Sequence, residues 1–143
     1  MNLTHEQVLE LLPQRDPIQM IDTAEDIIPG DSGTAHYYVK PDLPVLDGHF
    51  PGNPVLPGVY TIEACAQASE LVYFTTERGK GKQVLFLGIN NARFKKMVKP
   101  GDTMNLHVTT LSERTDKAIV TTHVDVDVEG VSVAEADVVQ IYF

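Results

Sequence analysis

Residues 59–76 read VYTIEACAQASELVYFTT, a stretch without glycine or proline in which helix-favouring residues are frequent. At 3.6 residues per turn it forms about five turns of helix. Its apolar side chains are spread around most of the helix circumference instead of forming a single stripe. The sequence therefore predicts one long central helix that other parts of the chain cover on most sides.

Segments with strand character lie on both sides of this helix. Two of them, Ile18–Ile28 and Thr34–Lys40, precede it and are separated by the turn-forming residues 29–33. The others follow it, namely Val84–Ile89, Arg93–Val98, Met104–Leu111, Ala118–Val128 and Val131–Tyr142. In residues 121–128 apolar and polar side chains alternate, as in a strand with one covered face. This order of elements predicts an α+β domain, residues 1–143, in which an antiparallel sheet wraps around the central helix.

The composition limits what the chain can do. With 43% hydrophobic and 22% charged side chains, it has the make-up of a folded domain and not of a disordered segment. Its formal net charge of −9 disfavours nucleic acids and anionic membrane surfaces as partners. No stretch is long and apolar enough to span a bilayer, and the first residues lack a secretory-signal pattern. The single cysteine, Cys65, excludes an intramolecular disulfide. We expect a cytoplasmic protein.

Residues 41–58, just before the helix, contain five prolines and three glycines. This composition largely excludes regular helix and strand, so we predict a loop of fixed shape. Its second half reads Gly48-His49-Phe50-Pro51-Gly52-Asn53-Pro54-Val55-Leu56-Pro57-Gly58. A histidine in such a loop is presented at a defined place, as a general base requires. His49 is therefore the candidate base, although spacing alone leaves open a histidine that only braces the loop.

Two further groups complete a possible elimination site. Glu63 lies about one and a half turns into the helix, where burial would let a carboxyl group keep its proton and act as an acid; a solvated carboxylate is the alternative. Gly58 lies at the helix N-terminus, where backbone N–H groups are free and a carbonyl oxygen can come close. The Gly58 amide would polarise a thioester carbonyl, His49 would remove the adjacent proton, and Glu63 would protonate the departing hydroxyl. Such a reaction requires no metal and no organic cofactor.

Five blocks of the sequence carry a family resemblance that covers nearly the whole chain. They are Leu12–Pro17, Gly48–Val59, Glu63–Gln67, Gly88–Phe94 and Val98–Asp102. In these blocks the chain resembles the 3-hydroxyacyl-acyl carrier protein dehydratases of type II fatty acid synthesis, the FabZ type, which have a hotdog fold. The long block Gly48–Val59 is the most specific of the five.

The resemblance implies a reaction, a site and an assembly. The reaction is dehydration of a (3R)-3-hydroxyacyl-acyl carrier protein to the trans-2-enoyl product, with His49 and Glu63 as catalytic residues. The Gly58 amide would bind the thioester carbonyl, and Gln67 would help to hold Glu63. Substrate contacts are expected from four positions, namely Phe50, Gly58, Val59 and Gln67. The implied assembly is a homodimer in which His49 and Glu63 of each site come from different subunits, with a hexamer, a trimer of dimers, as a larger form.

The chain departs from the family pattern at three positions. Gln14 stands where the family usually has histidine, and Gln19 interrupts a run that is usually hydrophobic. Both changes predict an altered substrate tunnel or chain-length preference. Cys65 stands in place of a more usual methionine, a change that packing can absorb.

Basic residues 93–96 form a candidate docking site on an otherwise acidic protein. Arg93, Lys95 and Lys96 would attract an acidic acyl carrier protein, whereas a solvated charged face is the plainer interpretation. The remaining histidines of the strand segments are His36, His107 and His123. They lack close metal-ligand spacing and are expected to be ordinary surface or core residues.

Two other functions remain open at this point. A hotdog-fold acyl thioesterase would use the helix carboxylate to direct water at the thioester and would release a free thiol. A non-catalytic partner subunit of a dehydratase heterodimer would be inactive alone and would be rescued by a second protein. The intact pair His49 and Glu63 favours the dehydratase over both.

Overall fold

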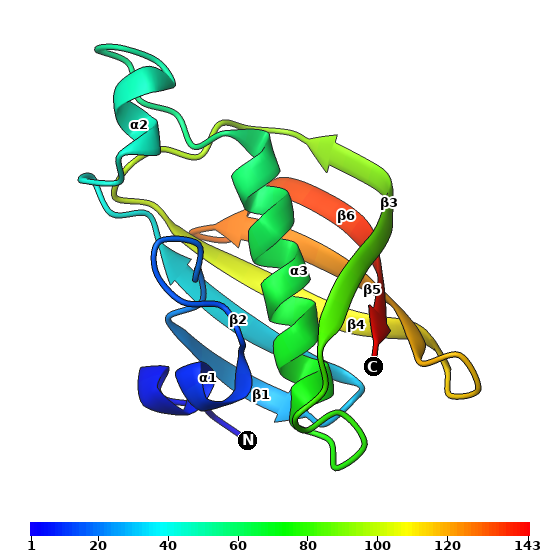
Figure 1. Cartoon of the computed structure of the whole chain (residues 1–143). Coiled ribbons are helices and arrows are strands. Elements are labelled where there is room, and N and C mark those ends of the chain that lie inside the picture. The colour runs from blue at the N-terminus through cyan, green and yellow to red at the C-terminus, as the bar shows by residue number, and fades with distance from the viewer.

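The computed structural model describes residues 1–143 as a curved antiparallel sheet wrapped around one long helix (Figure 1). The elements in chain order are α1 (His5–Leu11), β1 (Thr23–Ile28), β2 (Ser32–Tyr38), α2 (Val45–Gly48), α3 (Gly58–Phe74), β3 (Val84–Phe94), β4 (Thr103–Arg114), β5 (Ile119–Val128) and β6 (Val131–Tyr142). The strand order is β1-β2-β4-β5-β6-β3, and every pair is antiparallel. The predicted α+β architecture with an enclosed helix is confirmed.

The hydrophobic core lies between α3 and the concave face of the sheet. Ala64 and Leu71 of α3 are almost completely buried, as are Leu106, Val124 and Val138 of the central strands. The alternation predicted for residues 121–128 is confirmed, because the apolar positions of β5 face this core. Cys65, also on α3, is 1% exposed, and burial raises the pKa of its thiol to about 12. None of the helices combines the length and apolar character needed to cross a membrane.

Three predictions about the boundaries of elements were wrong. The loop over residues 41–58 contains one helical turn, α2, because Pro44 already has a helical backbone and proline is tolerated where a helix begins. The segments predicted as two strands, Val84–Ile89 and Arg93–Val98, form one strand, β3, which ends at Phe94; the register shifts at Asn90–Arg93, where the two segments join, as in a bulge. The first strand begins at Thr23, five residues later than predicted, because the backbone of Ile18 and Met20 bonds to a side chain of α3.

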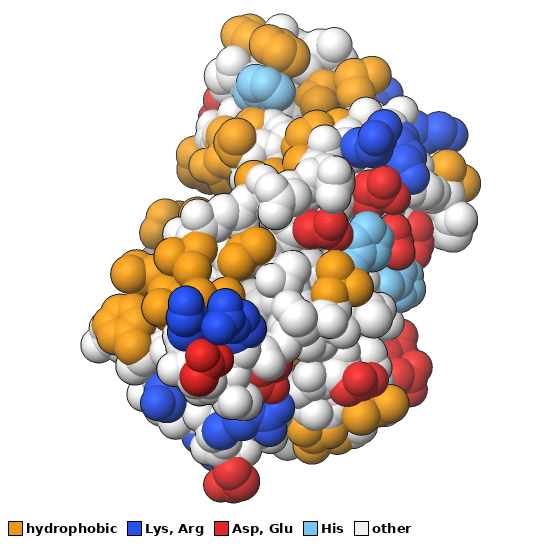
Figure 2. All heavy atoms as spheres, turned by 90° about the vertical axis from the view of Figure 1, so that its right-hand side faces the viewer, with side chains coloured by type: hydrophobic (Ala, Val, Ile, Leu, Met, Phe, Trp, Pro, Cys, Tyr) orange, Lys and Arg blue, Asp and Glu red, His pale blue; other side chains and the backbone are white.

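One edge of the sheet is unusually apolar. β3 pairs with β6 on one side only, so its other side is the outer edge of the sheet. Along it, five large hydrophobic side chains are exposed: Leu85, Phe86, Leu87, Ile89 and Phe94. Figure 2, which faces this side of the molecule, shows hydrophobic side chains gathered into patches between charged groups. A long exposed apolar edge strand is the kind of surface that pairs with another chain.

Candidate active site

His49 directly follows α2 and is fixed by short hydrogen bonds within its loop. The backbone N–H of Val55 donates to the carbonyl oxygen of His49 (2.8 Å), and Phe50 and Asn53 exchange backbone hydrogen bonds. The Nδ1 atom of His49 lies 2.8 Å from the carbonyl oxygen of Val55. Since a carbonyl oxygen only accepts, Nδ1 carries the hydrogen and the neutral ring presents its lone pair at Nε2. The loop therefore sets the tautomer that a general base needs.

The imidazole of His49 opens into a mostly apolar cavity of about 400 Å³. Gly58, Phe94, Lys95 and Lys96 also line this cavity. The Phe50 ring stacks on the imidazole at a centroid distance of 4.1 Å and an interplanar angle of 27°. A ring packed on one face limits the orientations that the imidazole can adopt beside the cavity.

Gly58 is the first residue of α3 and places a helix N-terminus in the same cavity. The N-cap Pro57 supplies no side-chain hydrogen bond, so no side chain caps the first amide groups of the helix. A Cβ atom at position 58 would lie 3.0 Å from Cε1 of Phe94. Glycine thus lets the Phe94 ring approach the helix end, and its amide can donate to an oxygen held in the cavity.

The carboxyl group of Glu63 accepts a hydrogen bond from Gln67, the residue one helical turn later on α3. Nε2 of Gln67 donates to Oε1 of Glu63 at 2.8 Å and to the carbonyl oxygen of Ile18 at 2.9 Å. Oε1 of Gln67 accepts from the backbone N–H of Met20 at 2.8 Å. Gln67 is 0% exposed, and these three bonds leave its amide only one orientation. The N-terminal segment therefore locks the side chain that positions Glu63.

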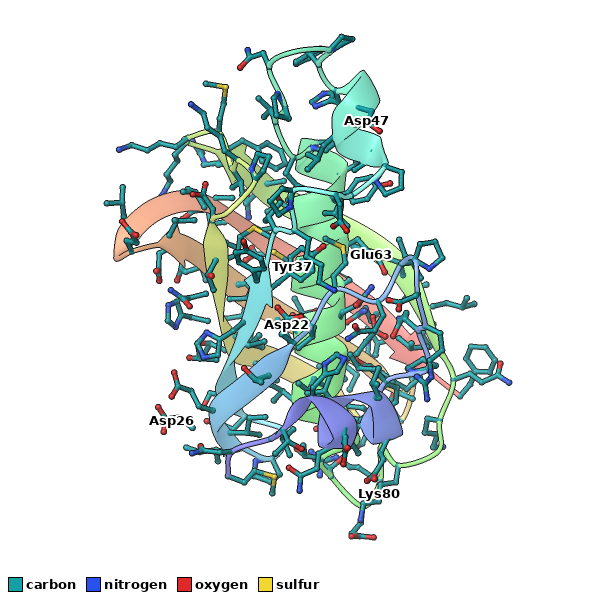
Figure 3. The ribbon with its side chains drawn as sticks, turned by 90° about the vertical axis from the view of Figure 1, so that its left-hand side faces the viewer. Asp22, Asp26, Tyr37, Asp47, Glu63 and Lys80 are labelled. Atoms are coloured by element: carbon teal, nitrogen blue, oxygen red, sulfur yellow. The ribbon has the colours of Figure 1, made fainter.

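Glu63 opens into a different cavity from His49. This second cavity, of about 180 Å³, is lined by Gln14, Glu63, Glu70, Gln140 and residues 84–86 of β3. Figure 3 shows Glu63 on α3, below the labelled Asp47 of α2. Within one chain the structure does not bring His49 and Glu63 into a common cavity.

Glu70 was not identified from the sequence; it is 3% exposed and lines the second cavity. Burial raises its pKa to about 7; the charge of Glu63 acts in the same direction, and hydrogen bonds from Gln14 and Gln140 oppose it. A glutamate in an otherwise apolar part of a helix, seven residues after Glu63, is the only signal that the sequence offers. Glutamate in a helix is mostly exposed to solvent, so sequence pattern alone does not mark this residue as buried.

The other residues predicted to contact substrate are placed less centrally. Phe50 is 52% exposed and Val59 is 72% exposed, and neither lines the His49 cavity in a single chain. Of the predicted docking residues, Lys95 lies 3.4 Å and Arg93 4.0 Å from carboxylate oxygens of Glu135. Lys95 and Lys96 stand at the wall of the His49 cavity, where a positive potential would meet an incoming substrate.

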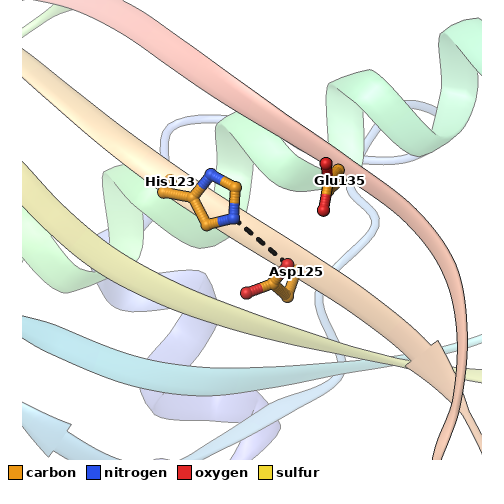
Figure 4. A group of neighbouring side chains, drawn as sticks. All are labelled: His123, Asp125 and Glu135. Atoms are coloured by element: carbon orange, nitrogen blue, oxygen red, sulfur yellow. Dashed lines mark hydrogen bonds and ion pairs between the residues drawn. The ribbon is translucent and has the colours of Figure 1, made fainter. Parts of the chain in front are cut away.

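One group on the outer face of the sheet has the residue types of a metal site. His123 and Asp125 of β5 and Glu135 of β6 have ligand atoms within 4.8 Å of one another (Figure 4). The imidazole of His123 already bonds to Asp125 and Asp137, and Glu135 pairs with Lys95. The hydrogen bond to Asp137 raises the pKa of His123. These contacts make the group a network of ion pairs.

The chain matches a known protein family and several known proteins. Residues 12–137 match the model of the FabA-like domain. The chain is 45% identical over 115 residues to a 3-hydroxyacyl-[acyl-carrier-protein] dehydratase FabZ of Pseudoalteromonas translucida, covering 79% of this chain and 77% of that protein. It is 43% identical over 114 residues to the FabZ of Enterococcus faecalis, covering 80% and 81%.

Among solved structures, the chain superposes on the dehydratase heterocomplex ApeI:P from Xenorhabdus doucetiae with a TM-score of 0.78. The superposition covers 94% of this chain and 89% of that chain at 16% identity. At this level of identity the likeness concerns the fold, which is the predicted hotdog fold.

Proposed function

This chain belongs to the FabA-like family. Because of this membership, we propose that it is a 3-hydroxyacyl-acyl carrier protein dehydratase of fatty acid or related acyl-chain biosynthesis. The observation that carries the proposal is the hydrogen bond from His49 Nδ1 to the Val55 carbonyl, because it leaves Nε2 free as a base. The substrate is a (3R)-3-hydroxyacyl thioester on the carrier protein, and the products are the trans-2-enoyl thioester and water.

The proposed mechanism gives each group one task. The Gly58 amide donates to the thioester oxygen, which stabilises the negative charge that develops when the C2–H bond breaks. Nε2 of His49 takes that proton. The C3–O bond then breaks as Glu63 delivers its proton to the departing hydroxyl, so that water leaves and the C2–C3 double bond forms. Passage of one proton from His49 to Glu63 restores both residues.

The proposed assembly is a homodimer in which His49 of one chain works with Glu63 of the other. Two observations support it. The two residues line different cavities of the single chain, and the apolar edge formed by β3 borders the Glu63 cavity and is open to a second chain. A pairing of two β3 edges would bury this surface and obey the twofold symmetry common among dimers. A hexamer, as a trimer of such dimers, is the larger form that we propose.

The proposed partner is an acyl carrier protein, which docks on Arg93, Lys95 and Lys96 beside the His49 cavity. These are local positive charges on a chain of net charge −9. Phe50, Val59 and Gln67 are proposed to contact or support the substrate. The proposed location is the cytoplasm, with which the buried free thiol of Cys65 agrees.

The deciding experiment incubates the protein with a 3-hydroxyacyl carrier protein and measures enoyl product and free thiol in the same tubes. His49→Ala and Glu63→Gln are run beside the unmodified chain. We expect enoyl product without thiol from the unmodified chain and a large loss in both variants. Thiol release would instead identify a thioesterase. An inactive chain that a second protein activates would identify a partner subunit.

A further inference from the structure

The cavity that holds Glu63 has a polar end. Nε2 of Gln14 donates to Oε1 of Glu70 at 2.8 Å, and Nε2 of Gln140 donates to Oε2 of Glu70 at 3.0 Å. These three side chains come from the N-terminal segment, α3 and β6, and all of them line the cavity. Seven residues separate Glu63 from Glu70 on α3, which is about 10 Å at 1.5 Å per residue.

The hydrogen bonds fix this polar end in one arrangement. The hydroxyl of Tyr142 donates to Oε1 of Gln140 at 3.4 Å, which turns Nε2 of that amide toward Glu70. Gln140 is 2% exposed, so its orientation is determined from within the protein. Both carboxylate oxygens of Glu70 therefore face amide donors and remain in the cavity as a fixed polar group.

One acceptor in this cluster has no partner. Oε1 of Gln14 is buried and accepts no hydrogen bond. A buried acceptor without a donor is unfavourable, so a turn of the half-exposed Gln14 side chain that brings this oxygen to a hydroxyl group in the cavity would be favourable. An alkyl chain offers no hydrogen bond to Gln14 or Glu70 and would place apolar surface against these polar groups.

We propose that Gln14, Glu70 and Gln140 determine the acyl specificity of this site. The site binds 3-hydroxyacyl chains that are too short to reach Glu70 or that carry a hydroxyl group at the position of Glu70. It excludes long saturated chains. The inference rests on the proposed function, since it takes the Glu63 cavity as the place where the acyl chain lies. A chain spans about 10 Å in roughly eight C–C bonds of about 1.5 Å each, because the zigzag shortens the advance per bond.

The test compares three substrates on the carrier protein: 3-hydroxybutanoyl, 3-hydroxydodecanoyl and 3,12-dihydroxydodecanoyl. With the unmodified protein we expect kcat/KM for butanoyl to exceed that for dodecanoyl at least about tenfold, and the terminal hydroxyl to restore much of the loss. Glu70→Leu is expected to raise dodecanoyl turnover relative to butanoyl by about tenfold. Gln14→Leu, at a half-exposed position, is expected to shift the ratio in the same direction.

Ser69→Ala is the matched control. Ser69 is a buried polar residue next to Glu70, but it bonds to Thr122 and does not line the cavity. Its substitution is expected to leave the ratio of substrates unchanged. Equal use of butanoyl and dodecanoyl by the unmodified protein, or a ratio that neither leucine variant moves, would overturn the proposal.

Calorimetric binding of the same three carriers gives the chain-length ratio without turnover. Absence of dehydration with every substrate, butanoyl included, would count against the proposed function. The specificity proposal would then be decided by the binding ratio, with the same expected order and the same variants.

Discussion

Nε2 of Gln67 donates a 2.8 Å hydrogen bond to Oε1 of Glu63, one helical turn earlier on α3. The same amide also bonds to the backbone of Ile18 and Met20, so the carboxyl group is oriented by the first twenty residues of the chain. Precise placement of an acid is worth several orders of magnitude in rate.

Gln67→Leu is therefore expected to lower kcat by about 10²-fold with little change in KM, because Glu63 loses its orientation while the carrier still binds. It should also lower the free energy of unfolding by about 1–3 kcal/mol, since the Met20 amide stays buried without an acceptor. Steady-state kinetics and urea unfolding measure the two effects. Ser69→Ala, which removes a different buried hydrogen bond, should affect stability without this loss of kcat.

Mixed dimers test whether the site is shared between chains. His49→Ala and Glu63→Gln are each expected to be nearly inactive alone, with losses of about 10²–10⁴-fold. Random mixing of the two should restore about a quarter of the unmodified activity, because half of the dimers are mixed and each has one intact site. Activity is measured after the two variants are unfolded and refolded together. No recovery in a preparation shown to contain mixed dimers would mean that each chain holds a complete site.

Gly58→Ala tests the close contact at the start of α3. The new Cβ would lie 3.0 Å from the Phe94 ring, which is 54% exposed and has room to shift. We expect a change in the free energy of unfolding within about 1 kcal/mol, since alanine also favours the helix. We expect kcat/KM to fall about tenfold or more as the ring moves in the cavity and the amide is shielded. Gly48→Ala, where a Cβ would meet nothing within 4 Å, is the control.

Charge reversal at Lys95 and Lys96 tests the docking surface. The double variant to glutamate is expected to raise KM for the carrier-bound substrate about tenfold at low salt and to leave a small thioester analogue unaffected. The difference should shrink as salt is added. Lys117→Glu in the exposed β4–β5 turn changes the net charge far from the cavity and serves as control. Equal losses with both substrates would contradict docking at these lysines.

Glu70 makes stability depend on pH. Its pKa is about 7 in the folded chain and near 4.5 when exposed, so the folded state binds the proton more tightly. Stability is therefore expected to fall as pH rises from about 4.5 to 7, by up to about 3 kcal/mol, and to level off above that range. Glu70→Gln should remove this loss, so that the free energy of unfolding of the variant increases relative to that of the unmodified protein between pH 5 and pH 8. Urea unfolding at pH 5 and at pH 8 measures the free energy of unfolding of both proteins. The control Glu77→Gln, at a highly exposed side chain, should leave its pH dependence unchanged.

Local signals predicted most of the fold and the loop that carries His49. The absence of glycine and proline in residues 59–76 predicted α3 to within two residues at its ends. The prolines around His49 predicted a loop that holds its imidazole, and the hydrogen bond to Val55 is the contact that does so. Such features depend on neighbours in the sequence, so the sequence alone is sufficient to detect them.

Features that depend on distant residues escaped prediction. Gln14 and Gln140 meet Glu70 across sequence separations of 56 and 70 residues, and no local pattern marks either pair. The sequence predicts that one strand ends before the two asparagines of β3, but pairing with β6 continues the strand through them as a bulge. In both cases long-range contacts outweigh local preference.

Cys65 lies on the same helix as Glu63 and is 1% exposed. Since only the thiolate reacts readily with oxidants, and burial holds the pKa of this thiol at about 12, the sulfur is chemically inert in the folded chain. The chain has no other cysteine. We therefore expect oxidation of this thiol to follow unfolding of the chain and not to cause it, so that α3, which carries both Cys65 and Glu63, is protected from thiol oxidants while the chain is folded.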